Sequence, residues 1–106
     1  MRANLCNIED LVDGSARLFA VGETDLAIVR VGEECFALAD ECSHQKVSLS
    51  DGEFDLESFA LECPKHGSGF CLRTGAPTAL PATQPVAVYE VVIDEHGEVF
   101  VEVGDE

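Results

Sequence analysis

Two short motifs place cysteine and histidine side chains at a spacing that suits metal binding. Cys42 and His44 form a Cys-x-His pair, and Cys63 and His66 form a Cys-x-x-His pair. Each pair offers one thiolate and one imidazole at the tip of a short loop. Two such loops that face each other would provide four ligands to one metal site.

Two kinds of metal centre use this ligand set. Zinc binds two thiolates and two imidazoles in a tetrahedral structural site. A [2Fe–2S] cluster takes the same four side chains, with both cysteines on one iron and both histidines on the other. The ligand count does not distinguish them. The flanking Gly67, Ser68 and Gly69 favour the cluster, because glycines let backbone N–H groups approach a bridging sulfide closely.

Imidazole ligation determines the chemistry that such a cluster offers. With two thiolates and two neutral imidazoles the oxidised cluster has no net charge, so it accepts an electron more readily than a cluster with four thiolates. We find no Ser-His-Asp order, no phosphate-binding loop and no second metal-ligand set. The remaining histidine, His96, is interpreted as a solvent-exposed turn residue. The sequence therefore predicts an electron carrier and not an enzyme.

The length predicts one small domain spanning residues 1–106, and the short β-type runs along the chain predict an all-β fold. The net charge of −15 argues against nucleic-acid binding and favours the approach of basic partners. No apolar stretch is long enough to span a membrane, and residues 1–10 lack the apolar core of a signal peptide. We therefore expect a cytoplasmic protein and no membrane partner.

Three of the five cysteines lie outside the two motifs. In a reducing cytoplasm Cys6, Cys35 and Cys71 would stay as free thiols. Cys35 and Cys71 lie in apolar surroundings, so each is interpreted as a small buried apolar side chain.

Short β-type runs alternate with glycine-bearing turns, and no helical periodicity lasts longer than about two turns. Residues 8–12 suit a short helical turn. The segments expected to form strands of the base are 16–21, 26–31, 35–40, 86–93 and 99–103, with a hairpin turn at 94–97.

The interval between these strands carries both motifs. Short strands are expected at 54–56 and 59–62, and a tight turn at 73–75 suits a positive φ at Gly75. Residues 41–75 are therefore predicted to form a metal-binding subdomain inserted into the base. The following segment, 79–86, has two prolines and is predicted to be a connector.

The paired motifs resemble those of Rieske proteins, in which Cys-x-His is combined with Cys-Pro-x-His-Gly-Ser. The resemblance covers about residues 26–103. It implies a Rieske-like fold, in which antiparallel base sheets form a small sandwich or barrel that carries a cluster-binding subdomain. It also implies one [2Fe–2S] cluster, with Leu80 and Pro81 near it. The implied ligands are Cys42, His44, Cys63 and His66.

The branch of the family is indicated by two further positions. Respiratory Rieske proteins have an extra cysteine in each ligand loop, and these form a disulfide. Here those places hold Val47 and Lys65. The chain instead resembles the ferredoxins of bacterial aromatic-ring dioxygenase systems, which take electrons from a flavoprotein reductase and deliver them to a terminal oxygenase. We therefore expect this chain to be a monomeric ferredoxin with these two partners.

Three alternatives remain at this point. Similar small ferredoxins accompany iron–sulfur assembly proteins, and a Rieske-like small subunit occurs in nitrite reductase. A zinc-binding structural module would use the same ligands.

The resemblance also bears on the reduction potential. High-potential members have a loop serine, a tyrosine two residues later and the disulfide. This chain keeps only the serine, as Ser68, and has Phe70 in the place of the tyrosine. We therefore expect a potential in the lower part of the Rieske range of about −150 to +300 mV.

Overall fold

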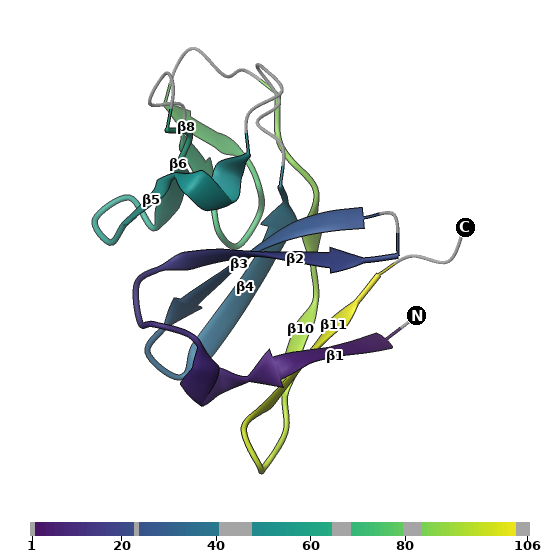
Figure 1. Cartoon of the computed structure of the whole chain (residues 1–106). Helices are drawn as coiled ribbons and strands as arrows, with labels where there is room; N and C mark the ends of the chain where they lie inside the picture. Colours follow the sequence, from purple (N-terminus) through teal and green to yellow (C-terminus); the bar gives the residue numbers. More distant parts are fainter. Residues whose placement is uncertain (1, 23, 41–47, 65–68, 80–83, 104–106) are drawn as a thin grey trace.

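The computed structural model describes residues 2–22, 24–40, 48–64, 69–79 and 84–103 (Figure 1). The strands form three sheets, and every pairing between neighbouring strands is antiparallel. The terminal sheet contains, in spatial order, β1 (Arg2–Asn7), β11 (Glu98–Glu102) and β10 (Val91–Ile93). The central sheet contains β2 (Ala16–Val21), β3 (Thr24–Val31), β4 (Glu34–Ala39) and β9 (Val88–Tyr89). The small sheet contains β5 (Glu53–Asp55), β6 (Ala60–Glu62), β7 (Gly69–Cys71) and β8 (Pro77–Ala79).

Helical structure is confined, within these ranges, to two 3₁₀ turns. They are η1 (Ile8–Asp10) and η2 (Leu49–Asp51). The predicted all-β fold with antiparallel base sheets is therefore confirmed, as is the short helical turn near residue 8. Neither turn, nor any other helix in the described part of the chain, has the length and apolar character needed to cross a membrane.

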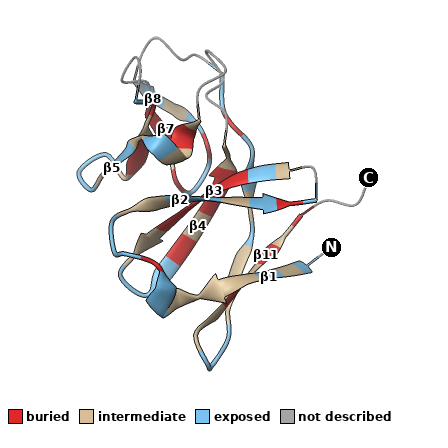
Figure 2. Ribbon diagram, viewed as in Figure 1, coloured by how far each residue is buried: buried red, intermediate tan, exposed pale blue. Residues whose placement is uncertain are grey.

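Strand β3 of the central sheet is buried on both of its faces. Four consecutive residues of β3, from Leu26 to Val29, are fully buried, as Figure 2 shows along this strand. Because side chains alternate along a strand, Leu26 and Ile28 pack towards the terminal sheet, and Ala27 and Val29 pack towards the small sheet. The continuous apolar run in the sequence thus reflects a strand between two layers, and each buried Leu or Ile contributes about 2 kcal/mol.

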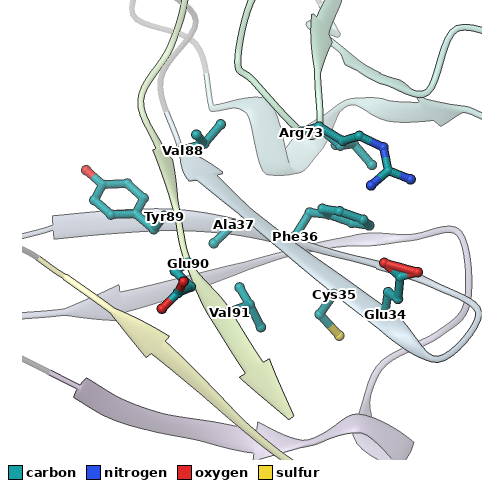
Figure 3. A pocket seen from close by; sticks show the side chains of 10 residues that line it. Glu34, Cys35, Phe36, Ala37, Arg73, Val88, Tyr89, Glu90 and Val91 are labelled. Atoms are coloured by element: carbon teal, nitrogen blue, oxygen red, sulfur yellow. The ribbon is translucent and has the colours of Figure 1, made fainter.

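One edge of the central sheet also contacts the small sheet through aromatic rings. The ring of Phe36 in β4 meets that of Phe59 edge to face at 5.2 Å between centroids. The guanidinium of Arg73 lies 4.6 Å from the centroid of Phe59 and 5.5 Å from that of Phe36. Figure 3 shows Arg73 beside Phe36 at the rim of a hollow of about 380 Å³, which β4 and the segment 88–91 also line. These contacts join the two layers on their exposed side.

The prediction of a single strand over residues 86–93 was wrong. Val88 and Tyr89 pair with β4 of the central sheet, whereas residues 91–93 pair with β11 of the terminal sheet. Glu90 lies at the crossing, where its carbonyl accepts the backbone N–H of Glu102 at 2.9 Å. One apolar run therefore serves two sheets, as strands at the corner of a sandwich do.

Three strands, β1, β7 and β8, were not predicted. β1 pairs with β11, its partner from the other end of the chain, so nothing in its local sequence indicates the pairing. β8 contains Pro77, which the sheet accommodates because β8 is an edge strand. The segment 84–87 has no strand, in agreement with the predicted connector, and residues 80–83 lie outside the described ranges.

The other predicted elements are confirmed within one or two residues. The meander over residues 16–40 is β2, β3 and β4, and the predicted strands at 54–56 and 59–62 correspond to β5 and β6. The turn at 94–97 is present, with the Asp94 carboxylate accepting the backbone N–H groups of His96 and Glu98, each at 2.9 Å.

Candidate metal centre

The structure describes one of the four predicted ligands, Cys63. The other three, Cys42, His44 and His66, lie outside the described residues. The chain segments that lead into and out of both ligand loops are described, and they show how the fold brings the two loops together.

The second ligand loop joins two paired strands. In β6 and β7, Leu61 is opposite Phe70 and Glu62 is opposite Gly69, so the chain leaves β6 and enters β7 at paired positions of the small sheet. A Cβ atom on Gly69 would overlap the hydroxyl of Thr78 in the neighbouring strand β8, so this position accepts only glycine without a shift. The loop therefore starts and ends at fixed points of the small sheet.

Cys63 has the environment of a ligand. Its side chain is only 3% exposed, and its thiol forms no disulfide. It belongs to the core cluster between the central and small sheets, together with Leu61 and Phe70. A hollow of about 360 Å³ lies beside it, lined by Asp51, Gly52, Glu53, Glu62, Cys63 and Pro64. A buried, unpaired thiol at the mouth of a loop suits a metal–sulfur bond.

The first ligand loop is closed at its base. Asp40 follows β4, and Ser48 precedes η2, so these two residues flank the loop segment 41–47. The Asp40 carboxylate accepts a hydrogen bond from the Ser48 hydroxyl and another from the backbone N–H of Ser50 at 2.6 Å. The two ends of the loop are thereby tied to each other.

The bases of the two loops also touch. Gly52, which ends η2, lies so close to β6 that a Cβ atom on it would overlap the carbonyl oxygen of Glu62. Glu62 directly precedes Cys63. The exit of the first loop is thus packed against the entrance of the second, and the described residues fit a centre that takes ligands from both loops.

Sequence reasoning missed Asp40, Ser48, Ser50 and Gly52 as residues of this site. The available signal was an acid two residues before the Cys-x-His motif, followed after the loop by Ser-Leu-Ser-Asp-Gly. Asp and Ser often accept and donate such local hydrogen bonds, but the pairing across the loop depends on loop closure, which the sequence alone does not show.

The remaining cysteines differ from one another. Cys35 is buried as predicted, and burial, with a smaller contribution from the nearby Cys6, raises its pKa to about 11. Burial, followed by the charge of Asp10, also raises the pKa of Cys6. Cys71 is half-buried, so its interpretation as a buried apolar residue was wrong. Its partial burial acts to raise its pKa, but hydrogen bonds from Thr74 and from backbone N–H groups outweigh this and lower the pKa.

His96 is separate from the site. Its side chain is 77% exposed at the β10–β11 turn, where Nε2 lies 3.8 Å from Oε1 of Glu95. The interpretation of His96 as a solvent-exposed turn residue is confirmed.

Comparisons with known proteins agree with this geometry. The profile of the Rieske [2Fe-2S] domain matches residues 2–90. The 3-phenylpropionate/cinnamic acid dioxygenase ferredoxin subunit of Photorhabdus laumondii is 39% identical over 102 residues, which cover 96% of this chain and 94% of that protein. The ferredoxin of carbazole 1,9a-dioxygenase from Nocardioides aromaticivorans IC177 superposes with a TM-score of 0.91 at 38% identity, covering 95% and 96% of the two chains.

A further solved structure contains a similar chain in an assembly. It is a complex of reduced oxygenase and oxidised ferredoxin in carbazole 1,9a-dioxygenase. This chain matches it with a TM-score of 0.85 at 40% identity, over 94% of this chain and 91% of that one.

These matches extend over nearly the whole chain and exclude the zinc module. The cofactor is one Rieske [2Fe–2S] cluster, which supplies a reversible one-electron step, and the protein is an electron carrier without a catalytic site of its own. The chain belongs to the Rieske [2Fe-2S] domain family, and within it to the ferredoxins.

Proposed function

We propose that this chain carries single electrons from a flavoprotein reductase to the terminal oxygenase of an aromatic-ring dioxygenase system. The observation that carries the proposal is the match, at 39% identity along almost the whole chain, to the ferredoxin subunit of such a dioxygenase. The likeness to a ferredoxin in complex with its oxygenase supports direct transfer to the acceptor.

In this proposal the cluster is held by Cys42, His44, Cys63 and His66. The support is the Rieske motif together with the burial of Cys63 and its free thiol. The packing of Gly52 against Glu62 supports it further, because that contact brings the bases of the two ligand loops together.

We also propose that residues 1–106 form one domain with a cluster-binding subdomain at about 41–75. The small sheet, whose strands lie between residues 53 and 79, supports the subdomain. A cytoplasmic location is supported by Cys6, Cys35 and Cys71, the described cysteines outside the ligand set, none of which forms a disulfide. We propose a monomer, which light scattering of the holoprotein tests directly.

Reconstitution tests the proposed transfer. The purified holoprotein is added to the reductase and oxygenase of a carbazole or phenylpropionate dioxygenase, and substrate oxidation is followed against NADH consumption. We expect substrate oxidation to require this chain and to saturate with its concentration. Rapid reduction of the chain without any transfer to either oxygenase would contradict the proposal, and transfer to an iron–sulfur assembly protein instead would identify the other carrier role.

A further inference from the structure

The backbone of Asp40 is held in place independently of the first ligand loop. The backbone N–H of Asp40 donates to the carbonyl of Asp25 at 3.0 Å, which anchors this residue at the end of the central sheet. Asp25 belongs to β3 and Asp40 directly follows β4, so the anchor joins the ends of two paired strands of the central sheet.

From this anchor the carboxylate reaches across the base of the loop. One oxygen accepts the Ser48 hydroxyl and the other accepts the backbone N–H of Ser50 at 2.6 Å. The hydroxyls of Ser48 and Ser50 lie 2.9 Å apart, so the three side chains form one connected group. All three residues are half-buried, and hydrogen bonds to a carboxylate shielded from water are stronger than neutral ones.

The carboxylate also replaces the usual cap of η2. Ser48 is the residue before this turn, but its side chain forms no capping hydrogen bond with the turn. Its hydroxyl donates to Asp40 instead, and Asp40 accepts the N–H of Ser50 that a capping serine would normally accept. The position of η2 therefore depends on Asp40.

Through η2 this dependence reaches the second ligand loop. Gly52 follows η2 and packs against the carbonyl of Glu62 with no room for a Cβ atom. A shift of η2 would accordingly move Glu62 and the adjacent Cys63, or open the contact between the two loops.

We propose that Asp40 is a positioning residue for the [2Fe–2S] cluster. Through Ser48, Ser50 and η2, Asp40 holds the first ligand loop in position against the second. The inference rests on the proposed ligands. It assigns to Asp40 no contact with the cluster and no electron-transfer step of its own.

The test compares holoproteins carrying Asp40→Ala, Asp40→Asn or Ser48→Ala. Glu33→Gln is the control, because it removes one negative charge from an exposed position in the turn between β3 and β4. Loss of iron to a chelator is followed by absorbance, and the reduced cluster is examined by EPR. Loss of a residue that orients metal ligands costs about tenfold or more in metal retention, so we expect Asp40→Ala to lose iron about tenfold faster than wild type.

The other variants show whether Asp40 acts through the serine. Asp40→Asn and Ser48→Ala should give intermediate rates and altered EPR g-values, whereas Glu33→Gln should match wild type in both. The double variant Asp40→Ala/Ser48→Ala should lose iron no faster than Asp40→Ala alone, because both changes break the same contact. A general loss of stability would not change the g-values of the intact cluster.

One result would contradict the proposed role of Asp40, and a different result would contradict the proposed function. If Asp40→Asn and Ser48→Ala retain iron and g-values like Glu33→Gln, then Asp40 does not position the cluster. If Asp40→Ala does not fold, the Ser48→Ala result decides alone, since that variant keeps the bond from Ser50. A wild-type protein that holds no iron–sulfur cluster would instead contradict the proposed function.

Discussion

Phe70 is the residue at which sequence and structure bear most directly on the reduction potential. It is fully buried in β7 and shares a core cluster with Cys63. A phenylalanine offers no hydroxyl to a cysteine sulfur, so it does not stabilise the extra negative charge of the reduced state. The burial of Phe70 beside a predicted ligand is thus consistent with the low potential expected from the sequence.

We predict that Phe70→Tyr raises the reduction potential. A hydroxyl at position 70 would donate a hydrogen bond to a cysteine sulfur of the [2Fe–2S] cluster and favour its reduced state. Protein-film voltammetry measures the change, with Phe100→Tyr as the control, because it adds the same hydroxyl to β11 of the terminal sheet. Equal potentials in wild type and Phe70→Tyr would show that the hydroxyl does not reach the sulfur.

At the residue scale, the sequence was sufficient to predict the ligand motif but not the neighbouring residues that hold the ligand loops in position. Cys63 was predicted as a ligand because its spacing to His66 is local. The contact between Gly52 and Glu62 depends on how η2 packs against β6, and a glycine after Ser-Asp suggests only a turn.

At the scale of elements, Gly75 fixes the connection between the small and central sheets. It has φ 77°, and its backbone N–H donates to the Cys71 carbonyl at 2.7 Å. Its own carbonyl accepts the N–H of the buried Val86 at 2.9 Å. A Cβ atom on Gly75 would overlap the Val86 carbonyl oxygen. The turn was predicted from the glycine, but the approach of Val86 was not, because it joins segments on either side of β8.

Gly75→Ala should therefore destabilise the protein more than Gly14→Ala does. Gly14 has nearly the same φ of 79°, but a Cβ atom there would meet nothing within 4 Å. The left-handed backbone alone costs an alanine about 1–2 kcal/mol, so we expect that loss for Gly14→Ala and at least about twice that for Gly75→Ala. Urea unfolding of both variants measures the difference. Equal losses would mean that the Val86 contact relaxes without cost.

The break between β9 and β10 shows the limit of sequence patterns for elements. Residues 86–93 are apolar and rich in valine, which favours one strand. The chain changes sheets at Glu90 because β4 and β11 each require a partner, and that requirement follows from the arrangement of the layers.

In the whole molecule, the cluster of Phe36, Phe59 and Arg73 side chains forms contacts between the central and small sheets in addition to the buried core that joins them. Phe59 has φ 53°, an unusual value for a bulky residue, and its carbonyl accepts the N–H of Leu72 at 3.1 Å. Its ring also meets that of Phe54 edge to face at 5.7 Å. The strained backbone thus places one ring in contact with both layers, with the Arg73 guanidinium over it.

We expect Arg73→Ala to lower the free energy of unfolding by about 1–2 kcal/mol, because the guanidinium lies over two rings that belong to different sheets. Arg17→Ala is the control. Arg17 lies over a single ring, that of Phe19 at 5.2 Å, and both residues belong to β2. Guanidinium chloride unfolding compares the two variants. A loss in Arg73→Ala no larger than that in Arg17→Ala would show that this cluster does not hold the layers together.

The three-layer arrangement explains why the fold class was predictable and the pairing of the chain ends was not. The continuous apolar run of β3 and the glycine-bearing turns indicate an all-β protein from local sequence. The pairing of β1 with β11 is set by closure of the whole molecule, which no local pattern records.

The central claim is that this chain carries a [2Fe–2S] cluster held by Cys42, His44, Cys63 and His66. The most direct measurement is EPR with electron–nuclear double resonance on the holoprotein after one-electron reduction, with iron and acid-labile sulfide measured on the same sample. We expect a rhombic signal of about one spin per two irons, with coupling to two histidine nitrogens that is lost in Cys63→Ser together with the cluster. An EPR-silent protein that holds zinc, or a reduced cluster without histidine nitrogen coupling, would contradict the account.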